Sequence, residues 1–293
     1  MHSNNVSTLI KRLAMTAAAL ALAQPAWAQT SSLYGWTYRP DAGGNVDFVS
    51  ISDVDGHASF QFSIAVPTGY EARDLTYDPT AGGGAGRFFG LLRGSANSLL
   101  AEIDPMAQTM ITHSISGLPN PGLEGIEFLK GTGLVMSGAD VTGTINALFV
   151  VNHSGTVLQT GLVPGLQDQD SLYANSLGGN LHVSDVNHPT GGYYLNEWHD
   201  PFGTPILTGV YHGPRTGSEL DVAIDPYSNI VYTSQRGRLA RYDMGIQQQF
   251  VVGDFNYATI WGIATVPAPG SIVLGAVACS MIGLRRRGHA RSV

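Results

Sequence analysis

The chain has 293 residues, a formal net charge of −7, 37 glycines and a single cysteine. An anionic chain is a poor partner for nucleic acid, because affinity for phosphate backbones depends on lysine and arginine. The lone cysteine, Cys279, excludes an internal disulfide, and outside its own segment it also excludes thiolate zinc sites and a cysteine nucleophile.

The first 28 residues have the pattern of a secretory signal peptide. Lys11 and Arg12 precede an apolar run over residues 13–23, and Ala26 and Ala28 occupy the two small positions of an A-x-A cleavage site. The run has no polar face, which an amphipathic helix would require. The pattern predicts export, with cleavage after Ala28.

Residues 29–266 form the body of the protein. The segments on either side, 1–28 and 267–293, contain six of the 15 basic residues and none of the 22 acids, so the body carries a formal charge of −13. Its 238 residues are enough for one large hydrophobic core. Short runs of β-forming residues alternate with Gly, Asn and Asp turns, and no long stripe of 3.6-residue period appears. We therefore predict an all-β fold.

A short element recurs along the body: an acid, a small or apolar pair, and an alternating run. Four copies begin at Asp74, Glu124, Asp170 and Asp221, and a last copy without an acid occupies residues 261–265. Three further strand-like runs follow each of the four. The interval of 40 to 51 residues suits a four-stranded propeller blade of roughly 40–50 residues.

The two ends of the body complement each other. Residues 33–38, 46–52 and 59–66 offer three strands before the first full repeat, and residues 260–266 offer one strand after the last. Together they complete a blade, which would close a ring and remove exposed sheet edges. We predict a β-propeller of about five four-stranded blades. Rings of six or seven blades and a pair of β-sandwiches are the alternatives.

Asp-Pro pairs occur at predicted strand ends, at residues 78–79, 104–105 and 225–226. Proline presets the second position of a turn, and the aspartate side chain accepts local amide hydrogen bonds, so these pairs can be purely structural. In this feature the body loosely resembles β-propellers of the NHL and YVTN kind.

The acids that open the repeats form a candidate ligand or cation site. If each copy is the innermost strand of its blade, these acids lie near one mouth of a central channel. Such carboxylates could bind Ca²⁺ through oxygen ligands or bind sugar hydroxyls, and close placement would raise their pKa values. Alternatively, each acid caps a turn or pairs with an arginine. The residues are Asp74, Glu124, Asp170 and Asp221.

No motif in the body names a reaction. It has no G-x-S-x-G nucleophile elbow, no P-loop and no dinucleotide-binding fingerprint after a strand. Its histidines never form an H-x-H, H-x-x-H or H-E-x-x-H pair. Residues 196–200 (NEWHD) are the densest polar and aromatic cluster, which suits either a sugar-stacking loop or a hairpin at a blade edge.

The chain ends in a short motif, an apolar run and an arginine cluster. The apolar run, residues 272–284, would form a helix only about 20 Å long, short of a hydrocarbon core of roughly 30 Å. Arginine side chains snorkel and a bilayer thins locally, so the helix could still span, with its arginines on the cytoplasmic side. The motif is Val266, Pro267, Ala268, Pro269 and Gly270, and the cluster is Arg285, Arg286 and Arg287.

This ending resembles the PEP-CTERM sorting domain. In that family a Pro-Glu-Pro motif, a transmembrane helix and a basic end are recognised by an exosortase, a membrane transpeptidase. Here Ala268 replaces the glutamate. The resemblance implies an exosortase-type transpeptidase as partner and transient anchoring in the inner membrane. It also implies a final place at the cell surface or in an extracellular polysaccharide matrix, and no catalytic activity.

These patterns predict an exported binding or structural protein whose ligand is a matrix glycan or protein. The alternative is a propeller hydrolase or lyase that acts on extracellular polysaccharide or a small ester. An enzyme would bring several acids and a histidine together in one pocket. A binding module would instead present a shallow face with exposed tryptophan or tyrosine.

Overall fold

The computed structural model describes residues 31–116, 123–139, 146–162, 169–174, 180–185, 194–212, 220–225, 228, 230–235 and 237–267. Residues Ser31–Pro267 form one compact unit. The predicted signal peptide with Ala26 and Ala28, and the predicted tail helix with its arginine cluster, lie outside the described residues. Within the described ranges, no helix has the length and apolar character needed to cross a membrane.

In these ranges, twenty strands form five antiparallel sheets of four strands each. Blade 1 contains β20 (Ile260–Val266), β1 (Ser32–Thr37), β2 (Asn45–Ile51) and β3 (Ala58–Ala65). Blade 2 contains β4 (Tyr70–Asp78), β5 (Arg87–Gly94), β6 (Ser98–Asp104) and β7 (Thr109–Ser114). Blade 3 contains β8 (Leu123–Leu129), β9 (Gly133–Ala139), β10 (Asn146–Val151) and β11 (Val157–Leu162). Blade 4 contains β12 (Gln169–Ala174), β13 (Asn180–Asp185), β14 (Tyr194–His199) and β15 (Ile206–His212), and blade 5 contains β16 (Leu220–Ile224), β17 (Ile230–Gln235), β18 (Arg238–Asp243) and β19 (Gln248–Asp254).

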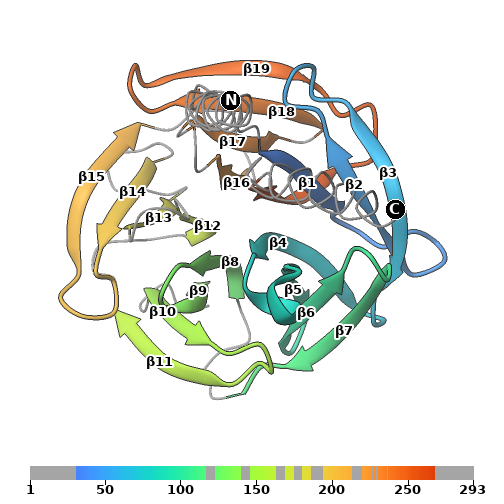
Figure 1. Ribbon diagram of the computed structural model, residues 1–293, viewed down its shortest axis with the longest axis horizontal. Coiled ribbons are helices and arrows are strands. Elements are labelled where there is room, and N and C mark those ends of the chain that lie inside the picture. The colour runs from blue at the N-terminus through green and yellow to red at the C-terminus, as the bar shows by residue number, and fades with distance from the viewer. Residues whose placement is uncertain are drawn as a thin grey trace, which may run out of the picture. The chain divides into compact units, whose positions relative to one another are not determined.

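The five blades surround a common centre. Their innermost strands, β20, β4, β8, β12 and β16, contact one another in ring order, and the fourth strand of each blade lies at the periphery (Figure 1). This arrangement confirms the predicted all-β propeller of five four-stranded blades. It excludes a pair of β-sandwiches.

The ring closes between the two ends of the body, as the sequence predicts. Strand β1 pairs antiparallel with β20, with Leu33 opposite Thr265 and Gly35 opposite Ile263. A register shift then leads to the pair Thr37 and Ile260. Blade 1 therefore joins residues more than 200 positions apart, and no inner edge of the ring is left open there.

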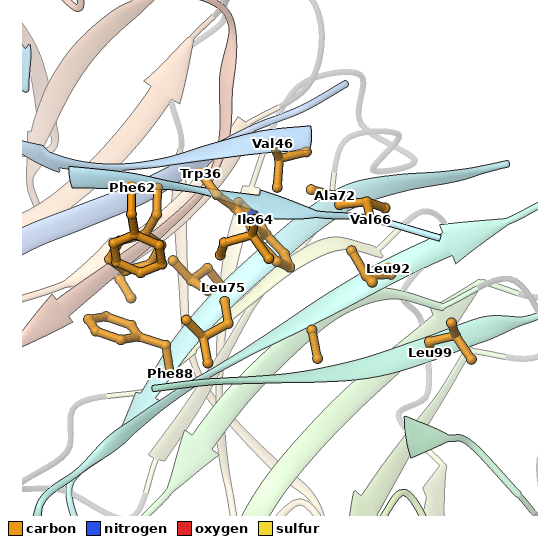
Figure 2. Close-up of a cluster of buried hydrophobic side chains, with 14 residues drawn as sticks. Trp36, Val46, Phe62, Ile64, Val66, Ala72, Leu75, Phe88, Leu92 and Leu99 are labelled. Carbon is orange, nitrogen blue, oxygen red and sulfur yellow. The ribbon is translucent and has the colours of Figure 1, made fainter. Parts of the chain in front are cut away.

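A hydrophobic core fills the space between blades 1 and 2 (Figure 2). The ring of Phe48 lies 5.0 Å from Phe62 and 4.9 Å from Phe88, measured between centroids. Trp36 is fully buried, and its Nε1–H donates to the carbonyl oxygen of Arg73 at 2.6 Å. Because a buried donor left without a partner is costly, this bond ties β1 to β4.

Candidate functional site

The inner strands lie side by side around the centre of the ring, which therefore has two ends. The amides of Ile126 and Phe128 in β8 donate to the side chains of Asp74 and Thr76 in β4, so these two strands run in the same direction. Strands β16 and β20 are related in the same way, through Asp221 with Ile263 and Ile224 with Thr265. We call the end of the ring at which the inner strands begin the strand-start mouth, and the end at which they finish the strand-end mouth.

Asp74 and Asp221 are almost completely buried, each with 1% of its surface exposed. One carboxylate oxygen of Asp74 accepts from the amide of Leu75, and the other accepts from Ile126 in β8 at 2.8 Å and from Leu172 in β12 at 3.4 Å. Asp221 accepts from the amide of Ile263 in β20. Backbone groups at the inner edge of a blade have no further strand to pair with, and these carboxylates satisfy them.

The two aspartates also meet each other. Their side chains share a hydrogen bond, which requires a proton on one of them. Burial raises the pKa of Asp74 well above its usual range, and the negative charge and hydrogen bond of Asp221 add to this effect. We therefore expect the pair to share one proton.

The other two predicted acids are placed differently. The carboxylate of Glu124 forms an ion pair with Arg93 in β5, in the neighbouring blade. Asp170 belongs to β12, but its side chain lies outside the described part of the chain. Thus the structure brings Asp74 and Asp221 together and gives Glu124 a separate partner.

A further acid, Glu127, lies beside the pair and was not among the predicted residues. Its carboxylate accepts hydrogen bonds from the Thr76 hydroxyl and from the amide of the next residue, Phe128, both at 3.0 Å. Burial raises the pKa of Glu127 well above its usual range, the two hydrogen bonds oppose this, and the charge of Asp221 raises it further. The sequence feature that could have identified Glu127 is its place as the second acid in the repeat element that begins at Glu124.

At the strand-end mouth the inner strands enclose a cavity of about 20 Å³, which suits a single water molecule. All five inner strands contribute to its wall, including Thr76, Glu127 and Ala174. Among the described residues, no group of three or more His, Cys, Asp or Glu side chains could hold a metal ion. The carboxylates of Asp74 and Asp221 accept hydrogen bonds from backbone amides, and we expect them to share a proton.

The strand-start mouth carries an aromatic and cationic cluster, which we call the start-mouth cluster: Tyr38, Arg39, Glu71, Arg73 and Trp261. The rings of Tyr38 and Trp261 stack with centroids 4.2 Å apart. The Arg73 guanidinium lies 4.5 Å from the Trp261 ring and 5.1 Å from the Tyr38 ring, within cation–π range. Arg39 lies 5.0 Å from Tyr38 and has 70% of its side chain exposed.

Glu71 holds this cluster together. It accepts from the Tyr38 hydroxyl at 2.7 Å and forms ion pairs with Arg39 at 3.3 Å and Arg73 at 3.5 Å. Burial raises the pKa of Tyr38, and its hydrogen bond to Glu71 adds to that shift. The Nε of Arg73 is buried and has no hydrogen-bond partner in the described structure. The cluster is therefore fixed in place, with one donor still unsatisfied.

Two other sequence candidates are placed by the structure. Residues 196–199 belong to strand β14 rather than to a loop, and Trp198, 5% exposed, packs in the hydrophobic cluster between blades 3 and 4. Of the predicted sorting motif, Val266 ends β20 and Pro267 follows it, whereas Ala268, Pro269 and Gly270 lie outside the described residues.

Comparison with known proteins supports the fold alone. No family model and no curated protein sequence matches the chain. A chain in a crystal structure of a nidogen/laminin complex is similar over 80% of this chain and 98% of its own length, with 11% identity and a TM-score of 0.54. The Dos1 propeller (12% identity, 73% of this chain, 56% of its own, TM-score 0.41) and TolB from Acinetobacter baumannii (10%, 80%, 57%, 0.46) are more distant. The chain thus shares its fold with the similar chain of the nidogen/laminin complex, to which its sequence bears little likeness.

Proposed function

We propose that this protein is an exported glycan-binding module of the cell surface or extracellular matrix, sorted by its C-terminal segment. The support for export is the signal-peptide pattern that ends at Ala28. The support for sorting is the resemblance of residues 266–287 to the tail recognised by exosortases. Both features lie at the ends of the chain and leave the propeller to bind a ligand.

The observation that carries the binding role is the start-mouth cluster. Sugars bind proteins through apolar ring faces that stack on aromatic side chains and through hydroxyls that bond to fixed polar groups. Tyr38 and Trp261 supply the stacked rings, and the exposed guanidinium of Arg39 supplies donors. Trp261 lies in β20, and Glu71 in β4 holds both Tyr38 and Arg39, so little ordering entropy is lost when a ligand binds.

The geometry supports binding over hydrolysis or lysis. A catalytic acid must reach the proton that it transfers, with access to the substrate. Asp74 and Asp221 are buried and are already engaged by amides of neighbouring blades. The acids nearest the channel axis therefore have a structural use that accounts for their burial.

A glycan array probed with the full chain tests the binding role. We expect selective binding of one class of glycan, and we expect Trp261→Leu to weaken it at least about tenfold, because truncating an aromatic hot spot costs about 2 kcal/mol or more. The matched control is Phe250→Leu, which removes a 39% exposed aromatic that also faces an arginine, Arg241, on an outer strand. No selective binding, or equal loss in both variants, would refute the proposal.

Cell fractionation tests the sorting role separately. The full chain should reach the surface or matrix fraction, whereas a chain that lacks residues 267–293 should be exported and released. Replacement of Arg285, Arg286 and Arg287 by glutamine should divide the protein between the surface fraction and the released fraction, because the basic end orients the helix. Full-length protein in the cytosol would contradict export.

A further inference from the structure

A larger cavity, of about 590 Å³, lies at the strand-end mouth between blades 2 and 3. This volume is within the range of roughly 300–1,000 Å³ that is typical of small-molecule sites. Pro79 and Phe128 give its wall apolar surface. The last residue of β4 and the segments that follow β4, β8 and β10 supply its polar side chains, which are Asp78, Thr80, Lys130, Thr132 and His153.

His153 is held in a fixed position in this cavity. Its Nε2 lies 2.9 Å from a carboxylate oxygen of Asp78, whose side chain is 1% exposed. The other oxygen of Asp78 accepts from the amide and the hydroxyl of Thr80, both at 2.7 Å. The imidazole also stacks on the buried ring of Phe89, 4.6 Å away. Even so, 46% of the His153 side chain remains exposed.

The histidine is not required by the turn that Asp78 makes. Asp225 directly follows β16 in blade 5, much as Asp78 ends β4, and each is followed by proline. The carboxylate of Asp225 accepts from the hydroxyls of Ser31 and Ser228. A serine therefore satisfies the equivalent acid elsewhere in the ring, so the turn alone does not account for a histidine in blade 3.

The hydrogen bond to Asp78 fixes the chemistry of the free nitrogen. A carboxylate only accepts, so Nε2 carries the proton and, in the neutral ring, Nδ1 offers a lone pair. No described residue donates to Nδ1, and no described acid pairs with Lys130. The lining of the cavity thus includes one cation and one fixed acceptor, beside Pro79 and Phe128, while the carboxylate of Asp78 is almost fully buried and already engaged by Thr80 and His153.

We propose that this cavity, the Lys130 pocket, binds the uronic-acid residue of an acidic glycan. The sugar carboxylate would pair with the Lys130 ammonium, and a ring hydroxyl would donate to His153 Nδ1. The apolar face of the sugar would lie against Phe128 and Pro79. The inference rests on the proposed glycan-binding role and assigns it a second site, at the mouth opposite the start-mouth cluster.

Calorimetric titration of the full chain with D-glucuronate, D-glucose and acetate tests the pocket. We expect glucuronate to bind at least about tenfold more tightly than either control, because only glucuronate offers both the carboxylate and the hydroxyls. Lys130→Met should weaken glucuronate binding at least about tenfold, since it keeps the aliphatic stem but removes the charge. Lys130→Arg should restore most of the affinity.

Two further variants distinguish this pocket from general charge attraction and from the start-mouth cluster. Arg238→Met removes one exposed positive charge from blade 5 and should leave glucuronate binding unchanged. Trp261→Leu should also leave it unchanged. If Lys130→Met and Arg238→Met lose glucuronate affinity equally, or if glucose binds as tightly as glucuronate, the proposed uronate site is wrong. Loss in Trp261→Leu alone would place the uronate at the start-mouth cluster, so the pocket would fail while the glycan-binding role would stand.

Discussion

Asp74 and Asp221 show how a buried acid can serve the backbone rather than a ligand. The inner edge of each blade faces the channel, and its amides need acceptors. Asp74 supplies them for two blades and Asp221 for a third. Because burial and the neighbouring Asp221 raise the pKa of Asp74, the centre of the ring is sensitive to pH, as expected from the sequence for closely placed acids.

Asp221→Asn should reduce the pH dependence of stability. The raised pKa of Asp74 means that the folded state binds more protons than the unfolded state. That stabilisation is complete below about pH 4 and is lost as pH rises through the pKa that Asp74 has in the folded state. The free energy of unfolding falls by about 1.4 kcal/mol per pH unit for each proton that the folded state binds in excess of the unfolded state. Asparagine donates to Asp74 without a proton from solvent and still accepts from Ile263. Urea unfolding between pH 4 and 9 should give a flatter curve for the variant.

Asp221→Ala is the matched control. It leaves the Ile263 amide without its acceptor, and it should lower the free energy of unfolding by about 1–3 kcal/mol across the whole range. If wild type and Asp221→Asn lose stability in parallel with rising pH, the shared proton is not a feature of the folded protein.

Gly90 in β5 is needed because the ring of Trp36 occupies the space where a Cβ would lie. Gly90→Ala should therefore cost about 1–3 kcal/mol through overpacking of the core between blades 1 and 2. The penalty should shrink in a Trp36→Leu background, since residues in contact couple in a double-mutant cycle. Additive losses, measured by thermal unfolding, would rule out this contact as the cause.

At the scale of the element, β20 is the strand on which the ring depends. It pairs with β1 and contacts both neighbouring inner strands, β16 and β4. A chain that ends after residue 259 should lose cooperative unfolding, whereas one that ends after Pro267 should unfold as the full chain does. Calorimetry compares them directly. A single sharp transition at the same temperature in both would show that the strand is dispensable.

The strands and the closure of the ring could be predicted because both depend on local patterns. Alternating runs separated by turns predict strands, and one strand at the end complements three at the start. The grouping of acids could not be predicted in the same way. Register shifts in β4 and β8 fall at Asp74 and Glu124, and a one-residue slip turns a side chain to the other face of its sheet.

The start-mouth cluster was missed for a different reason. Arg73 and Trp261 lie in β4 and β20, and Tyr38 follows directly after β1, so the three are far apart in the sequence and nothing local marks any of them. Their contact follows from ring closure, which brings β1, β4 and β20 together. Such a site becomes visible only when the topology is known.

At the scale of the whole propeller, an acidic body presents two mouths of different chemistry. The formal charge of residues 29–266 is −13, yet the start-mouth cluster gathers two arginines with two aromatic rings. The strand-end mouth instead offers a small central cavity and the Lys130 pocket. A rigid ring separates these two surfaces, so ligands at one should not occlude the other.

Hydrogen–deuterium exchange with the strongest neutral glycan from the array is the most direct test of the binding role. If the start-mouth cluster is the binding surface, peptides that cover residues 37–41, 70–73 and 257–262 should exchange more slowly with ligand, and peptides that cover 128–133 should not change. Protection confined to the outer strands, or absent altogether at saturating ligand, would contradict binding at the strand-start mouth.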